Sequence, residues 1–404
     1  MKQIINHFTD NDLYTFTCMY YILQKYPRAE TEYRFFDRNR TCYPKGFDLL
    51  LREQLEHLAE VVITDEEREF MTRSFPFLPY WFINVFLRGF RFNPAELTIS
   101  QDEEGHLDIR VKGKWWSTII WEMPILATIS ELMHTLNGDT MKYDAEAEWE
   151  KSLQKGCQIW TNGLTLGDMG TRRRFTFDHQ ERVIDALIQS YAEVCKETGG
   201  HCGKFTGTSN VYFAMKKNIP CLGTMSHQCI SFEEIVSGVF ECNYNVMNKW
   251  SEVYDGNVGI FLYDCFGDRV FFNNLSKRMA MTFCGLRIDS GVEEEQVDMI
   301  VEKYKQLGID PMSKQAVFSN GLDIKRAVEI HRYCQGKITD SYGVGTFLTC
   351  DVTDCSPMNI VVKLVRGRIT ESREWHPCVK LSCDKGKTLG DAKKCEYLVS
   401  VLNE

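Results

Sequence analysis

The chain has 404 residues, of which 44% are hydrophobic and 12% aromatic, and it carries a formal net charge of −9 at pH 7. This length and apolar content suffice for a large core and suggest two or three domains, or one barrel with additions. The acidic balance argues against general binding to nucleic acid or to an anionic membrane, so any anion site must be local.

Targeting and metal-binding patterns are missing from the sequence. The first residues show no signal-peptide pattern, and no stretch approaches roughly 18 uninterrupted apolar residues, so we expect a cytoplasmic protein without a membrane span. The spacings of the 16 cysteines, among them Cys195/Cys202 and Cys350/Cys355, include no C-x-x-C pair. We therefore expect reduced, buried thiols and no zinc site.

Residues 1–120 mix helices with strands. A capping-box-like pattern at Thr9 and Asp12 predicts the start of an aromatic helix, and a second such pattern, at Thr64 and Glu67, predicts another helix start. The aromatic segment 75–90 is either core or a surface for a partner subunit. Two segments alternate apolar and polar residues and are predicted strands: 29–38 and 106–113.

From about Trp121 a helix over 122–137 is followed by a rhythm of short strand, loop and amphipathic helix. One such helix, 292–308, has an apolar face and a glycine stop. This alternation implies a parallel sheet, open or closed, in which chemistry collects on the loops after the carboxyl ends of the strands. The residues that fall there are Asp264, Asp289, Gly321, Gly343 and Gly345.

Three consecutive arginines, Arg172 to Arg174, follow a Gly-Asp-Met-Gly turn and precede a helix that we expect to start with a capping box at Asp178 and Glu181. Successive side chains point in different directions, so the three cannot all reach one small ligand. From this stretch alone, a solvated basic run and a socket for carboxylate and phosphate groups both stay open.

Two Gly-Thr turns and a glycine-rich loop are further candidates. The turns lie at Gly207–Thr208 and Gly223–Thr224, and His227 follows the second. Neutral imidazole is a competent nucleophile or base near pH 7, although a single histidine is more often structural. Backbone amides in the loop at Gly343, Gly345 and Thr346 are typical of a phosphate cradle.

Taken together, these segments resemble the nicotinate phosphoribosyltransferase family over essentially the whole chain. The resemblance lies in the order and approximate spacing of the segments TDNDLYTFTCMY, GTRRRF, FTGTSNV, GTMSH, LRIDSG, FSNGLD, GVGTFLTCD and KLSCDKGKTLGD. It implies an irregular TIM-like α/β barrel at 121–354, with an additional α/β domain formed by 1–120 and completed by 355–404. It also implies a homodimer with shared active sites.

The resemblance further implies a reaction and its residues. Nicotinate and phosphoribosyl diphosphate would give nicotinate mononucleotide and diphosphate, with Mg²⁺ and with ATP phosphorylating His227. Tyr14 would reach a neighbouring subunit's site and stack on the pyridine ring, with Met169 on the ring's other side, and Arg172 would meet the carboxylate or a phosphate. Arg287, Asp289 and Asp264 would lie near the base and ribose, and the 5′-phosphate would be held by Gly321, Gly343, Gly345 and Thr346.

The residue after Thr208 bears on the choice of base. Related nicotinamide enzymes have an Asp where this chain has Ser209, and a hydroxyl can donate to nicotinate where a carboxylate would repel it. Two departures from the family pattern, Gln228 in place of Glu and Val292 in place of Asp, put ATP coupling and metal or ribose contacts in question. The alternatives are nicotinamide or quinolinate phosphoribosyl transfer, or a non-catalytic nucleotide-binding paralogue.

Overall fold

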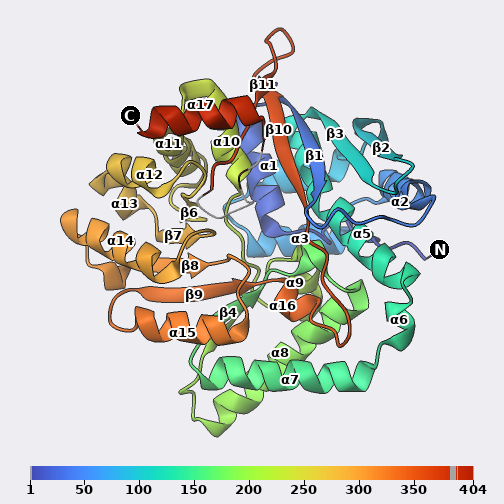
Figure 1. Cartoon of the computed structure of the whole chain (residues 1–404). Coiled ribbons are helices and arrows are strands. Elements are labelled where there is room, and N and C mark those ends of the chain that lie inside the picture. Colours follow the sequence, from blue (N-terminus) through green and yellow to red (C-terminus); the bar gives the residue numbers. More distant parts are fainter. Residues whose placement is uncertain (1, 383–387, 389, 404) are drawn as a thin grey trace.

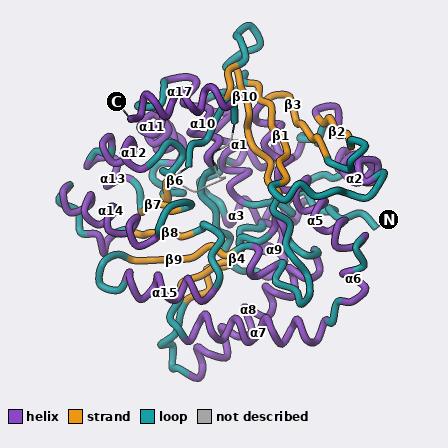
Figure 2. The backbone as a smooth tube through the Cα atoms, viewed as in Figure 1, coloured by secondary structure: helices purple, strands orange, loops and turns teal. Residues whose placement is uncertain are grey.

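The computed structural model describes residues 2–382, 388 and 390–403, and two β-sheets organise it (Figure 1). One sheet is antiparallel and combines strands from both ends of the chain. The other is parallel and is built from the middle of the chain, where strands and helices alternate (Figure 2). The α/β class is therefore confirmed. The last quoted segment of the family pattern falls partly outside the described residues, at 383–387 and 389.

The antiparallel sheet has the strand order β11-β10-β1-β3-β2. Its centre is β1, which pairs with β3 on one side and with β10 on the other. Both strands predicted in the N-terminal part are confirmed, and the segment after residue 355 packs beside them as expected, which supports the proposed division into domains. The strands are β1 (Glu30–Asp37), β2 (Leu97–Gln101), β3 (Leu107–Lys114), β10 (Ile360–Arg368) and β11 (His376–Pro377).

Helices of the N-terminal part pack around this sheet. The capping box at Thr64 and Glu67 is confirmed at the start of α3. The one expected at Thr9 is wrong: α1 starts at Leu13 after Asp12, and the Thr9 hydroxyl donates instead to Glu67. The helices are α1 (Leu13–Lys25), α2 (Phe47–Glu56), η1 (His57–Glu60), α3 (Asp65–Ser74), η2 (Phe82–Leu87), η3 (Pro94–Glu96), α4 (Trp115–Thr118), η4 (Ile119–Trp121) and α5 (Glu122–Leu136).

The aromatic segment 75–90 is core on one face, and its use as a surface for a partner subunit stays a prediction. Phe82, Ile83 and Leu87 are fully buried on one side of η2, a π-helical turn. On the other side Tyr80 and Val85 are mostly exposed, at 71% and 65%. The segment is therefore core on one face and an apolar surface on the other.

The parallel sheet has the order β5-β4-β9-β8-β7-β6, and every neighbouring pair is parallel. Cys221 extends it by one parallel bridge to Thr208, and β5 and β6 do not pair with each other among the described residues. The barrel is thus irregular and open, as expected. Its strands are β4 (Thr165–Asp168), β5 (Lys204–Thr208), β6 (Ile260–Leu262), β7 (Gly285–Ile288), β8 (Gln315–Phe318) and β9 (Thr339–Val344).

Amphipathic helices cover the parallel sheet. The predicted apolar face of α14 is buried, with Val297, Ile300 and Tyr304 in the core. The remaining helices are α6 (Asp139–Lys142), α7 (Ala145–Thr161), η5 (Thr171–Arg173), α8 (Phe177–Glu197), α9 (Val211–Lys217), α10 (His227–Ser237), α11 (Cys242–Tyr254), α12 (Asp268–Asn274), α13 (Lys277–Thr282), α14 (Glu293–Gln306), η6 (Pro311–Ser313), α15 (Ile324–Cys334), α16 (Thr346–Thr349) and α17 (Ala392–Asn403).

Two expectations about α8 need correction. The N-cap lies two residues earlier than the predicted Asp178, because the Thr176 side chain accepts a hydrogen bond from the His179 N–H. At its other end, Cys195 and Cys202 form a disulfide, although reduced thiols were expected. The left-handed conformations of Gly199 and Gly200 reverse the chain there and bring the two cysteines together, seven residues apart.

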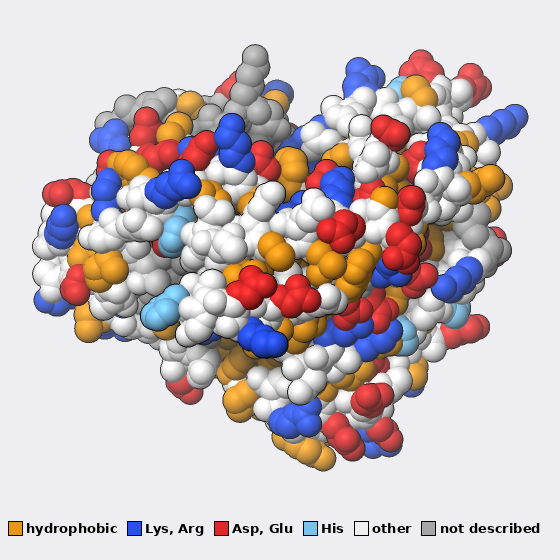
Figure 3. Space-filling model, turned by 90° about the horizontal axis from the view of Figure 1, so that it is seen from below, with side chains coloured by type: hydrophobic (Ala, Val, Ile, Leu, Met, Phe, Trp, Pro, Cys, Tyr) orange, Lys and Arg blue, Asp and Glu red, His pale blue; other side chains and the backbone are white. Residues whose placement is uncertain are grey.

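Surface charge is mixed rather than gathered into one field. The face in Figure 3 carries Lys and Arg side chains interspersed with Asp and Glu, with apolar side chains between them. Within the part of the chain that the structure describes, no helix combines the length and apolar character that a membrane span requires. Any site for anions must therefore be built locally.

Candidate functional site

A pocket lies between the antiparallel sheet and the carboxyl ends of the parallel strands. Residues from both sheets line it, so neither half of the chain forms it alone. It brings together most of the site residues that the sequence predicted, namely Tyr14, Met169, Arg172, Ser209, His227, Arg287, Asp289, Gly321, Gly343, Gly345 and Thr346.

Arg172 and Tyr14 form one end of the pocket. The Arg172 guanidinium lies over the Tyr14 ring, 5.3 Å from its centroid, and the Tyr14 hydroxyl donates to Glu122 at 2.8 Å. The expectation that Tyr14 serves a neighbouring subunit's site stays a prediction, and within this single chain Tyr14 lines the pocket of its own chain. The reason is that α1 begins directly beside the Gly-Thr turn after β5, where the Leu13 N–H donates to the Ser209 carbonyl.

Arg172 is positioned for an anionic ligand. Its guanidinium lies 3.8 Å from a Glu122 oxygen and 3.9 Å from an Asp12 oxygen. Both separations exceed hydrogen-bond length, so these carboxylates hold the charge in place without using its N–H donors. Planar guanidinium groups suit carboxylate and phosphate because they donate two hydrogen bonds at once.

The three arginines of the triplet have different partners, as expected. Arg173 lines the pocket and its guanidinium lies 3.4 Å from the Met358 carbonyl. Arg174 is fully buried and donates two hydrogen bonds of 2.8 Å to Asp10. The triplet is therefore neither a solvated run nor a single socket: one end faces the pocket and the other fixes the loop to the core.

His227 begins α10 at the opposite end of the pocket. Its Nε2 lies 2.8 Å from Asp264 Oδ1 and 2.8 Å from Lys380 Nζ, and Lys380 also donates to Asp264 at 3.1 Å. Burial, and then the charge of Lys380, lower the pKa of His227 to about 4. The imidazole is thus neutral at pH 7, as a nucleophile toward phosphorus requires.

Asp264 and Asp289 differ in position. Asp264 lies behind His227 and accepts a hydrogen bond from the Ser290 hydroxyl, so it orients the imidazole rather than lining the pocket. Asp289 lines the pocket, where Arg287 and Lys380 help to lower its pKa to about 2. It is therefore a fixed negative charge at physiological pH.

Ser319, at the end of β8, links these groups. Its hydroxyl accepts from Arg287 Nε and donates to Asp289 Oδ1, each at 2.8 Å. The Arg287 guanidinium also donates to the Met225 carbonyl, just before His227. The ends of the neighbouring strands β7 and β8 and the loop before α10 are thereby joined by hydrogen bonds.

The glycine-rich loops approach the pocket for two reasons. Gly321 adopts φ of +79°, which favours glycine, at the turn after β8. Gly343 is required by packing, since a side chain there would collide with the Met169 sulfur. Gly345 precedes α16, whose first residue Thr346 also lines the pocket.

Thr208 does not face the pocket. Its hydroxyl donates to the buried Asp168 at 2.7 Å, and Asp168 also accepts from the Gly170 N–H. Because Asp168 is the last residue of β4, this network fixes the Gly-Asp-Met-Gly turn to β5. Thr208 is therefore a structural residue, which corrects its assignment to substrate binding.

Ser209 lines the pocket, but its hydroxyl is already engaged: it donates to Asp12 Oδ1 at 2.7 Å. Asp12 is itself a pocket residue, and burial raises its pKa. The Ser209 hydroxyl, which was expected to donate a hydrogen bond to nicotinate, thus donates to the Asp12 carboxyl group instead. The discrimination between acid and amide must rest on Arg172 as well.

Sequence reasoning missed two lysines that face the pocket. Lys380 belongs to the C-terminal family segment, so its motif could have marked it. Lys363 is the single charged residue in the apolar run Ile360–Leu364 of β10, and that interruption was a usable signal. Burial lowers the pKa of Lys363 to about 8, and its ammonium makes no hydrogen bond or ion pair with the described residues.

The structure also explains the two departures from the family pattern. Gln228 also lines the pocket, and its amide oxygen accepts hydrogen bonds from the Tyr33 hydroxyl and the Trp115 indole, which an amide oxygen does as well as a carboxylate. Val292 is 53% exposed at the N-cap position of α14, outside the pocket lining. Because valine replaces the family's Asp at this position, α14 lacks a side-chain cap, and this replacement changes no residue of the pocket lining.

Comparisons with known proteins agree with this geometry. Residues 164–404 match the model of the nicotinate phosphoribosyltransferase (NAPRTase) family, and residues 9–130 match that of its N-terminal domain. A nicotinate phosphoribosyltransferase of Desulforapulum autotrophicum is 37% identical over 99% of both chains. The solved enzyme of Porphyromonas gingivalis superposes with a TM-score of 0.94 at 39% identity, covering 99% of this chain and 100% of that one. The Vibrio cholerae structure gives 0.88 at 27%, covering 99% and 94%.

Proposed function

The chain belongs to the nicotinate phosphoribosyltransferase family, and we propose that its pocket joins nicotinate to the ribose of phosphoribosyl diphosphate. The products are nicotinate mononucleotide and diphosphate, so the enzyme serves the salvage of NAD. The observation that carries the proposal is one pocket with Arg172 at one end, His227 and Lys380 at the other, and glycine-rich strand ends between them.

Nicotinate binds at the Arg172 end. The guanidinium takes the carboxylate of the base, and the Tyr14 and Met169 side chains lie against the faces of the pyridine ring. Asp12 and Glu122 keep Arg172 charged and directed. Preference for the acid over the amide follows from this guanidinium, because nicotinamide offers it no negative charge.

The ribose lies beside Asp289. As the pyridine nitrogen attacks the anomeric carbon and diphosphate leaves, positive charge develops on the ribose ring, and the ionised Asp289 stabilises it. The 5′-phosphate meets the backbone around Gly343, Gly345 and Thr346. Arg287 and Lys380 lie on the side of the departing diphosphate.

Mg²⁺ fits this side of the pocket. The ligand atoms of Asp264, Asp289 and His227 all lie within 4.8 Å of one another, and carboxylate oxygens are the hard donors that Mg²⁺ prefers. Asp289, which lines the pocket, would hold the ion together with substrate phosphates and water, with the Asp264 carboxylate behind it. A bound ion would neutralise charge on the diphosphate.

ATP couples to the transfer through His227. The lone pair of the neutral imidazole forms the bond to the γ-phosphorus as the bond to the β-phosphate breaks and ADP leaves, and the orientation of the ring is set by Asp264 and Lys380. The phosphohistidine adds negative charge beside Lys380 and Arg287, which reorganises the diphosphate end of the pocket. A cytoplasmic homodimer completes the proposal, and its assembly state can be measured by light scattering.

A product assay with nicotinate and nicotinamide, each with and without ATP, tests the reaction. We expect nicotinate mononucleotide as the main product and a higher yield with ATP. A preference for nicotinamide would contradict the role of Arg172, because the amide carries no negative charge. Absence of any mononucleotide in the presence of Mg²⁺ would favour a non-catalytic nucleotide-binding paralogue.

The variant His227→Ala separates coupling from transfer. We expect it to lose ATP stimulation and the acid-labile phosphoprotein while keeping slow transfer, because the histidine does not attack the ribose. Gln228→Glu is the matched control next to it, since Tyr33 and Trp115 can donate to either side chain. An equal response to ATP in the His227→Ala variant and the native enzyme would reject the assignment.

A further inference from the structure

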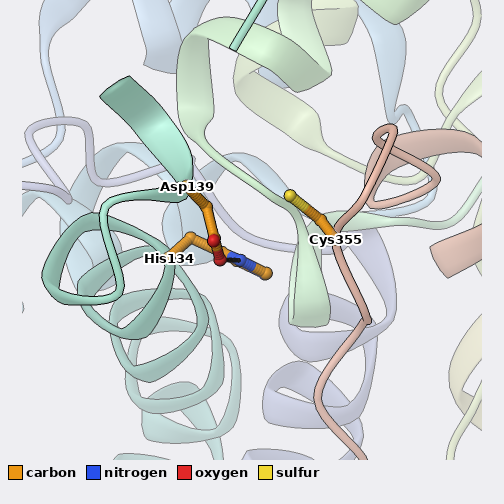
Figure 4. Close-up of side chains that lie close together, drawn as sticks. All are labelled: His134, Asp139 and Cys355. Atoms are coloured by element: carbon orange, nitrogen blue, oxygen red, sulfur yellow. Dashed lines mark hydrogen bonds and ion pairs between the residues drawn. The ribbon is translucent and has the colours of Figure 1, made fainter. Parts of the chain in front are cut away.

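A second group of metal-ligating side chains lies behind the arginine loop, outside the pocket lining. His134 ends α5, Asp139 begins α6, and Cys355 lies in the loop after α16 (Figure 4). One ligand atom from each of the three residues lies within 4.8 Å of the other two. Two segments more than 200 residues apart therefore bring an imidazole, a carboxylate and a thiol close together.

The two nitrogens of His134 have different neighbours. Nδ1 lies 2.9 Å from Asp139 Oδ2, and Nε2 lies 3.4 Å from the sulfur of Cys350. If Nε2 carries the ring proton and donates it to the Cys350 sulfur, the lone pair of Nδ1 faces Asp139 and Cys355. An outer partner that fixes the tautomer in this way is typical of metal-binding histidines.

The surroundings support a built site rather than a chance contact of surface groups. His134 is 3% exposed and Cys350 is fully buried, and both lie against Phe175. The left-handed conformation of Gly138 turns the chain between His134 and Asp139. These groups are therefore held in place by the fold.

The loop that carries the two cysteines is fixed from its other side by α7. Glu148 accepts a hydrogen bond from the Thr353 N–H at 2.8 Å, and Lys155 donates to Asp351 at 2.6 Å. Within the loop, the Cys355 N–H donates to the Val352 carbonyl, closing a turn that presents the thiol to α5 and α6. A cation bound by this cluster would connect the Cys350–Cys355 loop to α5 and α6, in addition to the contacts that the loop makes with α7.

We propose that His134, Asp139 and Cys355 bind a zinc-class divalent cation, with Cys350 as the outer partner of the histidine. The donor set of nitrogen, sulfur and oxygen suits Zn²⁺ and excludes Mg²⁺ and Ca²⁺, which take oxygen ligands. Binding displaces the thiol proton of Cys355 to solvent and leaves the fourth position of a tetrahedral ion for water.

The site would brace the arginine loop. Phe175 follows Arg174 directly, its ring lies 4.8 Å from that of His134, and its N–H donates to the Thr349 carbonyl just before Cys350. A cation that joins α5, α6 and the Cys350–Cys355 loop would therefore limit the motion of two segments that contribute to the pocket, the arginine loop and the segment that begins at Thr346. The role is structural, and the site does not touch substrate.

Metal binding to the full-length protein tests the proposal without substrates. Chelator-treated protein is titrated with Zn²⁺ in competition with a chromophoric chelator, and with Co²⁺ to detect the thiolate-to-cobalt absorption band. We expect one equivalent of Zn²⁺, a cobalt–thiolate band and a higher Tm. Cys355→Ser should abolish the band and weaken Zn²⁺ binding at least tenfold, and Asp139→Asn should weaken it while preserving the shape of the site.

Cys284→Ser, which changes an exposed thiol outside the cluster, is the matched control and should bind like the native protein. Equal Zn²⁺ affinity in the native protein, Cys355→Ser and Asp139→Asn would overturn the proposal, because the ion would then be bound elsewhere. No detectable binding, or a Cys350–Cys355 disulfide in the isolated protein, would overturn it as well. None of these outcomes depends on the transferase reaction.

Discussion

The two ends of the arginine loop differ more than their sequence suggests. Arg172 is 32% exposed in the pocket and keeps its donors for a ligand, whereas Arg174, two residues later, is 0% exposed and paired with Asp10. Arginine at position 172 is thus available to bind a ligand, whereas arginine at position 174 stabilises the fold. What separates them is the end of the 3₁₀ turn η5: Arg172 lies within the turn, whereas Arg174 follows it in extended backbone.

The loop after β7 shows the same division. Asp289 faces the pocket as a fixed charge, and Val292 lies on the surface at the start of α14. In both loops a family motif combines residues that line the pocket with residues that hold the backbone. A motif match therefore does not by itself assign a role to each of its members.

The largest effect is expected at the core end of the arginine loop. Arg174→Met keeps the volume but leaves Asp10 as a buried carboxylate whose remaining side-chain donor among the described residues is Asn210. Breaking such a pair costs roughly 3–5 kcal/mol of unfolding free energy. Denaturant unfolding measures it, and Arg174→Met with Asp10→Asn should recover part of the loss. A loss below about 1 kcal/mol would contradict the structural role.

Arg172→Met tests the pocket end with the same change. We expect the unfolding free energy to stay within about 1 kcal/mol, because the two ion pairs exceed hydrogen-bond length. The kcat/KM for nicotinate should fall about 100-fold, near 3 kcal/mol, since a charged bidentate contact is lost. Arg172→Lys should restore part of it. A Met variant that unfolds without a separate kinetic defect would count against this distinction.

Glu131, which lies beside Arg174, should make the stability of the protein depend on pH. Burial raises its pKa from the ordinary 4.5 to about 7, although Arg174 lies 3.8 Å away and opposes the shift. Because the folded pKa is raised, its contribution to stability is complete below pH 4.5 and is lost as pH rises through 7. The native protein should lose about 2–3 kcal/mol relative to Glu131→Gln over this range.

The measurement for Glu131 is the difference in unfolding free energy between the two proteins, taken at several pH values. Other titrating groups cancel in that difference. The Phe177 N–H can donate to the glutamine amide as it does to Glu131, so the helix start is preserved. A difference that does not change with pH would show that Glu131 is ionised throughout.

The smallest effect is expected at Val292. Val292→Asp supplies the missing N-cap of α14 and should raise the unfolding free energy by about 1 kcal/mol. Transfer activity should not change, because the side chain is outside the pocket. A change in the KM for phosphoribosyl diphosphate would instead place residue 292 among the substrate contacts. Val292→Ala is the control for removal of the exposed apolar side chain.

Much of the site could be predicted because its parts follow recognisable strand ends. The alternation of strands and helices over residues 258–351 placed the loops that carry Asp289, Gly321 and Gly345 at the carboxyl ends of neighbouring parallel strands. The errors came where a polar side chain had two possible partners. Thr9 was expected to cap a helix and instead bonds Glu67, and Thr208 was expected in the pocket and instead bonds Asp168. Those choices depend on neighbours that only the folded chain supplies.

The cluster of His134, Asp139 and Cys355 shows the limit from the other direction. No spacing rule identified it, because its ligands come from two segments more than 200 residues apart. Lys363 was missed for a related reason, since β10 reaches the pocket only by pairing with β1. Long-range pairing is not visible in local periodicity.

The sequence by itself determined the alternating α/β pattern, the family and the set of loops with chemical potential, because these follow from local spacing of apolar, glycine and charged residues. Tertiary structure decided which members of each loop meet the ligand, how Arg172 and Arg174 divide their tasks, and which lysines complete the pocket. The physical reason is that burial and pairing fix a side chain's partners, and both depend on segments brought together only when the two sheets pack.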